Sequence, residues 1–159
     1  MPTAISNSKI DISSIESTKK LAENFTGCLS KGSVVYLYGE IGVGKTTFIK
    51  YFINMHQKNN NIEITNVTSP TFNLLNEYVI GNLLIKHYDL YRLNDKSEIK
   101  DLDLFNNYKE SITFIEWPEL LNKKKLLNGI DLKFSYENNL KNRFVKISGL
   151  IWNLHWWNF

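Results

Sequence analysis

One eight-residue segment constrains the fold more than any other part of this 159-residue chain. Residues 39–46 read Gly-Glu-Ile-Gly-Val-Gly-Lys-Thr and fit the pattern G-x-x-x-x-G-K-[ST] of phosphate-binding loops. The run SVVYLY at 33–38 is rich in β-branched and aromatic residues and predicts a buried strand. After the loop, apolar residues recur at helical spacing through Ile53 and predict a helix. A strand before the loop and a helix after it are the context that phosphate binding requires.

Each residue type in this loop has a physical role in holding a nucleotide. Glycines let the backbone curl, so that successive N–H groups point into one concavity where phosphate oxygens accept hydrogen bonds. The positive end of the following helix dipole adds to this attraction. Lys45 has the reach to contact the β- and γ-phosphates, and the hydroxyl of Thr46 can bind Mg²⁺. The predicted nucleotide-binding residues of the loop are Gly39, Glu40, Ile41, Gly42, Val43, Gly44, Lys45 and Thr46.

Two acidic residues end predicted strands further along the chain. Asp89 follows the run 83–88, and Glu116 follows the apolar run 112–115. Ligands of open α/β sheets bind beyond the carboxyl ends of the strands, so both side chains can converge on the phosphates. Either carboxylate can hold Mg²⁺, directly or through water, or orient the attacking water. With Lys45 they form the predicted catalytic set, and both stay candidates for the metal.

Three other features near these carboxylates have two interpretations each. The segment VTSPTF at 67–72 carries hydroxyls around a stiff proline that can donate to a γ-phosphate, although by itself it indicates a turn. Trp117 directly follows Glu116 and either lines the nucleotide pocket or anchors the strand end in the core. His87 lies two residues before Asp89 on the same side of a strand, but we interpret it as a packing or surface histidine.

The remaining pattern predicts further strands and helices around the loop. A helix is expected after Ser13-x-x-Glu16, which has the spacing of a capping box. Gly81-Asn82 separates two apolar runs and predicts a hairpin of 71–80 with 83–91. We also expect a short strand at 8–12, an exposed loop at 57–61, a weak helix at 97–106, a strand at 111–116 and a hairpin of 130–136 with 143–148. The predicted fold class is α/β, a P-loop NTPase-type sandwich with a mixed, partly parallel sheet and antiparallel hairpins in the second half.

Composition limits the class of protein. Hydrophobic residues make up 43% and charged residues 22%, as in a soluble globular domain, and the length suits about one domain. The single cysteine, Cys28, excludes an intrachain disulfide and indicates a reducing compartment. A net charge of +3 is too small to indicate nucleic-acid binding by itself. Neither a signal peptide nor an apolar run of spanning length is present, so we expect a cytoplasmic protein without a membrane partner.

We predict one P-loop ATPase domain over residues 1–150, followed by an aromatic C-terminal tail at 151–159. The tail contains Trp152, Trp156 and Trp157. These side chains either form a patch where a partner docks or fold back over the domain's own core.

Four motifs, in order and spacing, resemble the bacterial TsaE family, the P-loop ATPases needed to make threonylcarbamoyladenosine in tRNA. They are LYGEIGVGKTTFIKYF, TSPTFNLLNEY, HYDLYRL and IEWPEL, and the similarity runs from about residue 14 to residue 149. The resemblance implies a phosphate loop over Gly39–Thr47, including Thr47, and Mg²⁺ ligands at Thr46 and Glu116. It implies a functional role for Asp89 and a nucleotide-sensing switch from Ser69 to Thr71. Arg92 falls in one family motif, and Arg143 opens the last strand.

The resemblance also implies partners and cofactors. ATP and Mg²⁺ are the expected cofactors, and homologues of TsaB and TsaD are the expected partners. Hydrolysis is expected to be slow alone and faster with these partners, while TsaD transfers the threonylcarbamoyl group to the adenosine next to the anticodon. Contact with tRNA is then expected through the complex rather than directly.

Two other functions are compatible with a phosphate loop. A small-molecule P-loop kinase needs a substrate pocket and usually a basic lid, for which the chain offers few residues and only Arg92 and Arg143 as arginines. A non-catalytic nucleotide-binding switch module needs the same loop as a slow ATPase. A GTPase is disfavoured, because the guanine-reading pattern N-K-x-D is absent.

Overall fold

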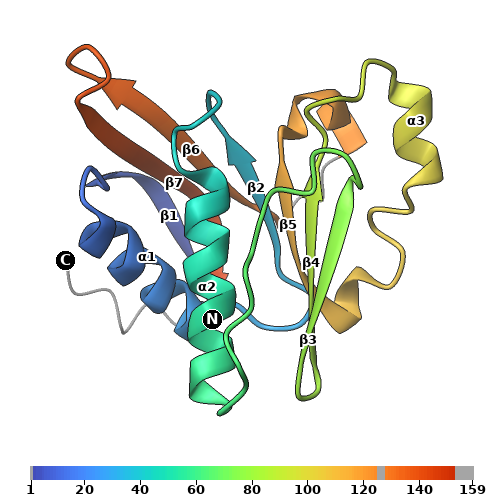
Figure 1. Ribbon diagram of the computed structural model, residues 1–159. Coiled ribbons are helices and arrows are strands. Elements are labelled where there is room, and N and C mark those ends of the chain that lie inside the picture. Colours follow the sequence, from blue (N-terminus) through green and yellow to red (C-terminus); the bar gives the residue numbers. More distant parts are fainter. Residues whose placement is uncertain (1, 125–127, 153–159) are drawn as a thin grey trace.

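The computed structural model describes residues 2–124 and 128–152, and within these ranges the strands form one mixed sheet (Figure 1). The strand order is β1-β7-β6-β2-β5-β4-β3. The central strand β2 runs parallel to β5 and β6, and β4 runs parallel to β5. The pairs β3–β4, β6–β7 and β1–β7 are antiparallel. The strands are β1 Pro2–Asp11, β2 Val34–Tyr38, β3 Leu75–Ile80, β4 Leu83–Asp89, β5 Ser111–Glu116, β6 Ile130–Glu137 and β7 Asn142–Trp152.

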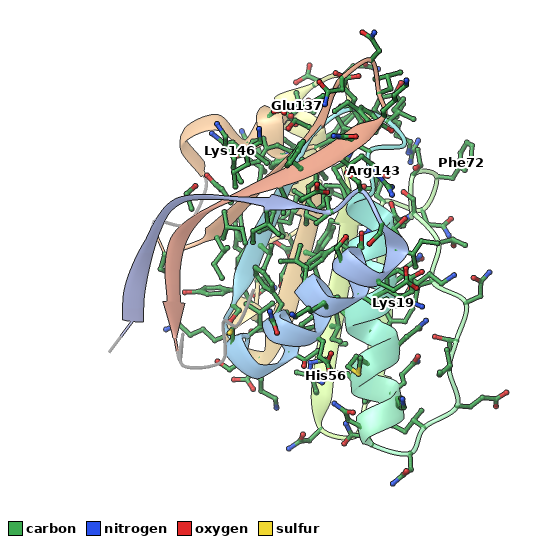
Figure 2. All side chains as sticks on the ribbon, turned by 90° about the vertical axis from the view of Figure 1, so that its left-hand side faces the viewer. Lys19, His56, Phe72, Glu137, Arg143 and Lys146 are labelled. Carbon is green, nitrogen blue, oxygen red and sulfur yellow. The ribbon has the colours of Figure 1, made fainter. Side chains whose placement is uncertain are left out.

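Helices cover both faces of the sheet. The helices α1 (Ile15–Cys28) and α2 (Lys45–Asn59) pack side by side on one face (Figures 1 and 2). The short helix α3 (Lys96–Asp101) and the 3₁₀ segment Pro118–Lys124 lie on the other face. A further 3₁₀ turn, Tyr108–Glu110, leads into β5. No helix in the described part of the chain is both long and apolar enough to cross a membrane.

Aromatic packing fixes α2 against the sheet. Phe48 and Phe52 lie on the apolar face of α2 and contact the ring of Phe114 on β5, with ring centroids 6.2 Å and 4.9 Å apart. All three rings are fully buried, and burying each phenylalanine contributes about 1.5–3 kcal/mol. The first turn of α2 is therefore held rigidly above the ends of the central strands, where a bound phosphate would meet the positive end of the helix dipole.

Strand register brings the predicted site residues to one edge of the sheet. On β4 and β5, Asp89 lies opposite Glu116, and on β2 and β5, Leu37 lies opposite Glu116. The phosphate loop follows β2 directly and leads into α2 at Lys45. The prediction that both carboxylates end strands and converge next to the loop is therefore confirmed, and the structure shows that these two strands are parallel.

Several element boundaries differ from the sequence-based expectations. Helix α1 is capped by Ser14, whose hydroxyl accepts from the backbone N–H of Ser17, so the predicted capping box from Ser13 is wrong. The hydroxyl of Ser13 instead accepts from the backbone N–H of Arg143 and ties α1 to β7. Strand β1 is longer than the predicted 8–12 segment because it pairs with the long strand β7.

The predicted exposed loop at 57–61 is wrong in its first half. Helix α2 continues to Asn59, and the side chain of Gln57 is only 3% exposed. Its amide donates to the Thr65 hydroxyl (2.9 Å) and accepts from the Thr65 backbone N–H (3.1 Å). A polar side chain at this position is buried because the segment that follows α2 satisfies both of its hydrogen-bonding groups.

Two other elements are shorter than expected. The first hairpin strand begins at Leu75, since residues 71–74 form a turn in which Leu74 has φ +66°. The weak helix expected at 97–106 is regular only over Lys96–Asp101, where Asp95 and Glu98 form a capping box.

At the C-terminus, β7 continues to Trp152, which pairs with Pro2. Trp156 and Trp157 of the predicted tail lie outside the described residues.

Candidate functional site

The phosphate loop requires glycine where it leaves β2. Gly39 has φ +132°, and a Cβ atom there would lie 2.6 Å from the backbone carbonyl oxygen of Phe134 on β6. The loop therefore packs directly on the neighbouring strand, which only glycine permits. Gly44, at φ +114°, ends the loop as the N-cap residue of α2 and has no side chain to occupy the space in front of the helix. Backbone N–H groups at this helix end are the ones that bind anions in such loops.

Lys45 lies inside the loop rather than in solvent. Its ammonium donates to the carbonyl oxygens of Gly39 (2.6 Å) and Glu40 (2.9 Å) and lies 4.1 Å from the ring centroid of Trp117. Burial lowers the pKa of Lys45 below its ordinary value, while the negative charges of Glu116 and Asp89 act in the opposite direction. The side chain is thus a desolvated donor whose partners are carbonyl oxygens that a phosphate can replace.

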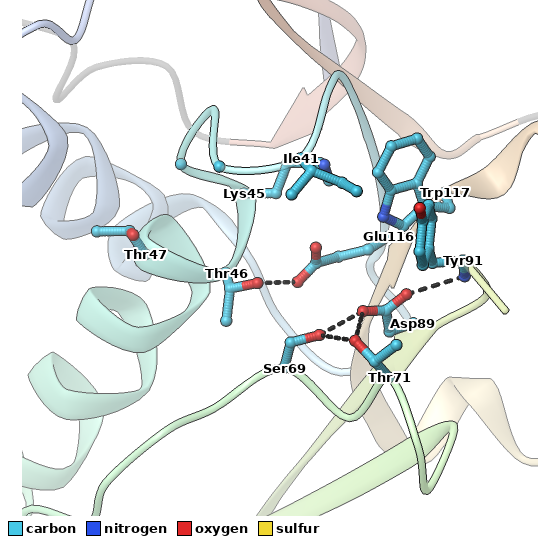
Figure 3. A pocket seen from close by; sticks show the side chains of 12 residues that line it. Ile41, Lys45, Thr46, Thr47, Ser69, Thr71, Asp89, Tyr91, Glu116 and Trp117 are labelled. Carbon is cyan, nitrogen blue, oxygen red and sulfur yellow. Dashed lines mark hydrogen bonds between the residues drawn. The ribbon is translucent and has the colours of Figure 1, made fainter.

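Glu116 is the acceptor at the centre of the site. Its Oε1 accepts from the hydroxyl of Thr46 at 2.7 Å and lies 2.8 Å from Nε2 of His87 (Thr46 contact in Figure 3). The carboxylate of Glu116 is almost fully buried, and His87 is fully buried. The structure therefore excludes the surface interpretation of His87 and shows a buried histidine that also contacts a predicted metal ligand.

Asp89 holds the segment around Pro70 against the sheet edge. Its Oδ2 accepts from the hydroxyls of Ser69 and Thr71, the latter at 2.8 Å, and its Oδ1 accepts from the backbone N–H of Tyr91 at 2.9 Å (Figure 3). The hydroxyls of Ser69 and Thr71 are 2.9 Å apart. A segment that read as a simple turn is thus fixed beside the phosphate loop by the carboxylate at the end of β4.

These groups surround one cavity of about 290 Å³. Its lining includes most of the predicted site residues and one further residue, Tyr91. The predicted ones are Ile41, Gly42, Gly44, Lys45, Thr46, Thr47, Ser69, Thr71, Asp89, Glu116 and Trp117. Gly39, Glu40 and Val43 do not line it. The carbonyl oxygens of Gly39 and Glu40 hold Lys45, and Val43 is buried in the core beneath the loop. The structure thus brings the predicted residues together at one end of the sheet.

Trp117 and Tyr91 form an aromatic wall of the cavity. Their ring centroids are 4.9 Å apart (Figure 3). Trp117 has φ +57°, a left-handed conformation that costs a non-glycine residue about 1–2 kcal/mol. This conformation ends β5 and brings the indole over Lys45, while the side chain also packs against a buried cluster that includes Tyr36, Ile115 and Leu121. Both interpretations of Trp117 therefore apply. Tyr91 was missed, although it lies two residues after Asp89 in HYDLYRL.

The two arginines lie outside the cavity lining. Arg92 is exposed. Arg143 lies at the start of β7 near the first turn of α2 (Figure 2) and donates through Nη2 to the backbone oxygen of Ser13 at 3.0 Å. Its Nη1 would be 3.7 Å from a Cβ atom on Gly44, so the guanidinium lies beside the last residue of the phosphate loop before α2.

The oxygen donors in this cavity suit a magnesium ion that is held partly by phosphate and water, rather than a metal ion bound by protein side chains alone. Among the described residues, no group of three or more His, Cys, Asp or Glu side chains is placed to hold a metal ion. Magnesium is typically bound through one or two carboxylates, water and the phosphates of the substrate. Glu116, Asp89 and the Thr46 hydroxyl provide such a partial set. The hydroxyl oxygen of Thr46 keeps lone pairs for a cation while its hydrogen is donated to Glu116.

Comparison with known proteins matches the part of the chain that contains the four motifs. The family model "Threonylcarbamoyl adenosine biosynthesis protein TsaE" matches residues 12–145. This chain belongs to the TsaE family. The tRNA threonylcarbamoyladenosine biosynthesis protein TsaE of Rickettsia bellii is 40% identical over 119 residues, which are 72% of this chain and 77% of that protein. The protein of the same name from Rickettsia conorii is 40% identical over 114 residues, which are 69% of this chain and 61% of that protein.

A solved structure supports the fold of this TsaE family member. The crystal structure of Bacillus subtilis YdiB matches with a TM-score of 0.66 and 23% sequence identity, covering 94% of this chain and 87% of that one. At this identity the likeness speaks for the fold alone. The predicted P-loop α/β fold is confirmed, and family membership assigns the chain to threonylcarbamoyl adenosine biosynthesis.

Proposed function

We propose that this TsaE family member is a Mg²⁺-dependent ATPase that supports threonylcarbamoyladenosine modification of tRNA together with homologues of TsaB and TsaD. The observation that carries the proposal is the hydrogen bond from Thr46 to Glu116, made beside Lys45 at the mouth of the phosphate loop. It joins the two residues that a phosphate-bound cation needs, although one comes from α2 and the other from β5.

Charge in the cavity favours a nucleotide with its cation. The cavity contains the ammonium of Lys45 and the carboxylates of Asp89 and Glu116. These two carboxylates repel a bare triphosphate, and a divalent cation removes that repulsion. The cavity is at the small end of the range of ligand pockets, about 300–1,000 Å³, so we infer that it receives the phosphates while the nucleoside lies outside it.

Lys45 is the residue that changes partners when phosphate binds. In the structure it donates to Gly39 and Glu40. Phosphate oxygens are stronger acceptors than these neutral carbonyl oxygens, because hydrogen bonds between ionised groups are the stronger class. Lys45 would therefore turn to the β- and γ-phosphates, while the backbone N–H groups of the loop hold the remaining oxygens. Bound Mg²⁺ would supply neutralisation of the charge that develops on the phosphates.

The two carboxylates then have different roles. Both described hydrogen bonds of Glu116 go to Oε1, which leaves Oε2 for the cation. The two oxygens of Asp89 accept from Ser69, Thr71 and the backbone of Tyr91. We therefore assign the metal to Glu116 and Thr46. Asp89 positions the hydroxyls of Ser69 and Thr71 towards the phosphate end of the cavity, where they can orient the attacking water.

Phosphate release tests the proposal. We expect slow release from ATP by the chain alone, loss of that release when EDTA removes Mg²⁺, and faster release when the TsaB and TsaD homologues are added. Preference for GTP would contradict the family-based assignment. Fast release that requires an added small metabolite would indicate the kinase instead, and binding without any release, alone or with partners, would indicate the non-catalytic switch.

A further inference from the structure

His87 occupies a position that packing alone does not explain. It lies on β4 between Ile85 and Asp89 on the face covered by α2, and it is fully buried. In the register of β4 against β5, His87 lies opposite Phe114. Its Nε2 nevertheless lies within hydrogen-bond distance of Oε1 of Glu116, which is two residues further along β5. The imidazole Nδ1 is buried without a hydrogen-bond partner among the described residues. The imidazole of His87 is thus buried among apolar side chains, and its one described hydrogen bond is to Glu116.

The direction of this hydrogen bond follows from the other contact of the same oxygen. Oε1 of Glu116 already accepts from the Thr46 hydroxyl, and a carboxylate is an acceptor for each further donor. His87 must then donate, with its hydrogen on Nε2. The hydrogen bond therefore places a hydrogen on Nε2, whereas Nδ1 makes no hydrogen bond among the described residues.

We propose that His87 is a positioning residue that fixes the rotation of the Glu116 carboxylate, so that Oε2 points towards the cation of a bound Mg·nucleotide. The inference rests on the proposed function. A carboxylate with one donor can still turn about its last side-chain bond, whereas two donors on Oε1, one from α2 and one from β4, hold it in one orientation. Such partners of metal ligands typically contribute a factor of about 10–100 in metal affinity or activity.

The test compares nucleotide binding with and without magnesium by isothermal titration calorimetry on the full chain. His87→Leu removes the donor at similar volume, and His87→Gln places an amide donor near the Nε2 position. We expect the ratio of the ATP Kd in EDTA to the ATP Kd in Mg²⁺ to fall about tenfold in His87→Leu and to stay within about twofold of wild type in His87→Gln. ATP affinity in EDTA should be the same in all three proteins.

A matched control is available on α2. His56 is half-buried, packs on Phe52 with ring centroids 4.7 Å apart, and lies at the other end of the helix from Thr46 (Figure 2). His56→Leu should leave the ratio unchanged. An unchanged ratio in His87→Leu, or an equal loss in His87→Leu and His87→Gln, would overturn the positioning role.

A second measurement needs no variant. Nitrogen-15 NMR of the wild-type chain should show His87 with hydrogen on Nε2, both free and with Mg·ATP. Hydrogen on Nδ1 alone would overturn the inference, because Nε2 would then have no hydrogen to donate to Glu116. If wild type shows no magnesium enhancement of ATP binding, the proposed function fails, and the tautomer alone decides whether His87 holds Glu116.

Discussion

Replacing Gly39 by alanine should damage both stability and the nucleotide site. The residue has φ +132°, which L-residues rarely adopt, and the added Cβ atom would lie 2.6 Å from the backbone oxygen of Phe134. Backbone strain of this kind costs about 1–3 kcal/mol. Overpacking against a strand that cannot move adds about 1–3 kcal/mol. We therefore expect Gly39→Ala to lower the free energy of unfolding by roughly 3 kcal/mol or to displace the loop from β6.

Thermal unfolding and ATP titration together measure these effects. For a chain of this length a loss of 3 kcal/mol corresponds to a fall in Tm of about 6–12 °C. ATP affinity should fall at least about tenfold, because a displaced loop no longer directs its N–H groups into one concavity. Gly27→Ala is the matched control, since Gly27 lies in α1 with no atom within 4 Å of the new Cβ. That variant should be unchanged or stabilised by about 0.5–1 kcal/mol.

The result that refutes this reasoning is specific. If Gly39→Ala unfolds within about 2 °C of wild type and binds ATP with wild-type affinity, the loop does not pack on Phe134 as described. If Gly27→Ala loses as much stability as Gly39→Ala, the loss reflects a general sensitivity to substitution rather than the geometry of the loop.

Three further predictions concern the cavity and the core. Lys45→Ala should weaken ATP binding by about 10–100-fold in calorimetry, since charged hydrogen bonds are worth about 1.5–3 kcal/mol; unchanged binding would contradict the phosphate-loop assignment. Thr71→Val keeps the side-chain shape but removes the hydroxyl that donates to Asp89 at 2.8 Å, so phosphate release should fall about tenfold while the ATP Kd changes less than about twofold; equal losses of both would argue against an orienting role. Burial raises the pKa of Tyr88 from 10.0 to about 12. The folded state therefore holds the phenolic proton more tightly than the unfolded state, and stability falls between pH 10 and pH 12. Tyr88→Phe should reduce this fall by about 1 kcal/mol at pH 11 in urea unfolding, and identical pH profiles would contradict that origin.

The parts of the fold that depend on local pattern were predictable from the sequence. The strand, loop and helix around Gly39–Thr46 were confirmed because glycine geometry, β-branched residues and helical spacing agree over one short segment. The hairpins at Gly81 and around 138–141 were confirmed for the same reason. Convergence of Asp89 and Glu116 followed from a general property of parallel strands, whose carboxyl ends share one edge.

Contacts between distant segments were not predictable in this way. His87 has the sequence environment of a buried strand residue, and only the register of β4 against β5 brings its Nε2 to Glu116. Burial of Gln57 depends on Thr65, which lies in an irregular segment with no periodic pattern. Ser13 and Ser14 are chemically equivalent as caps, and the choice between them depends on Arg143, 130 residues away. Each of these side chains acquires its role from a partner that its own local sequence does not specify.

The most direct test of the account is a crystal structure of the chain with Mg²⁺ and a non-hydrolysable ATP analogue. We predict the β- and γ-phosphates in the 290 Å³ cavity, with Lys45 moved from Gly39 and Glu40 to phosphate oxygens. The cation should be bound by Thr46 and Glu116, while Asp89 keeps its contacts with Ser69 and Thr71. Phosphates bound elsewhere, or a cation held by Asp89 without Glu116, would contradict the central claim.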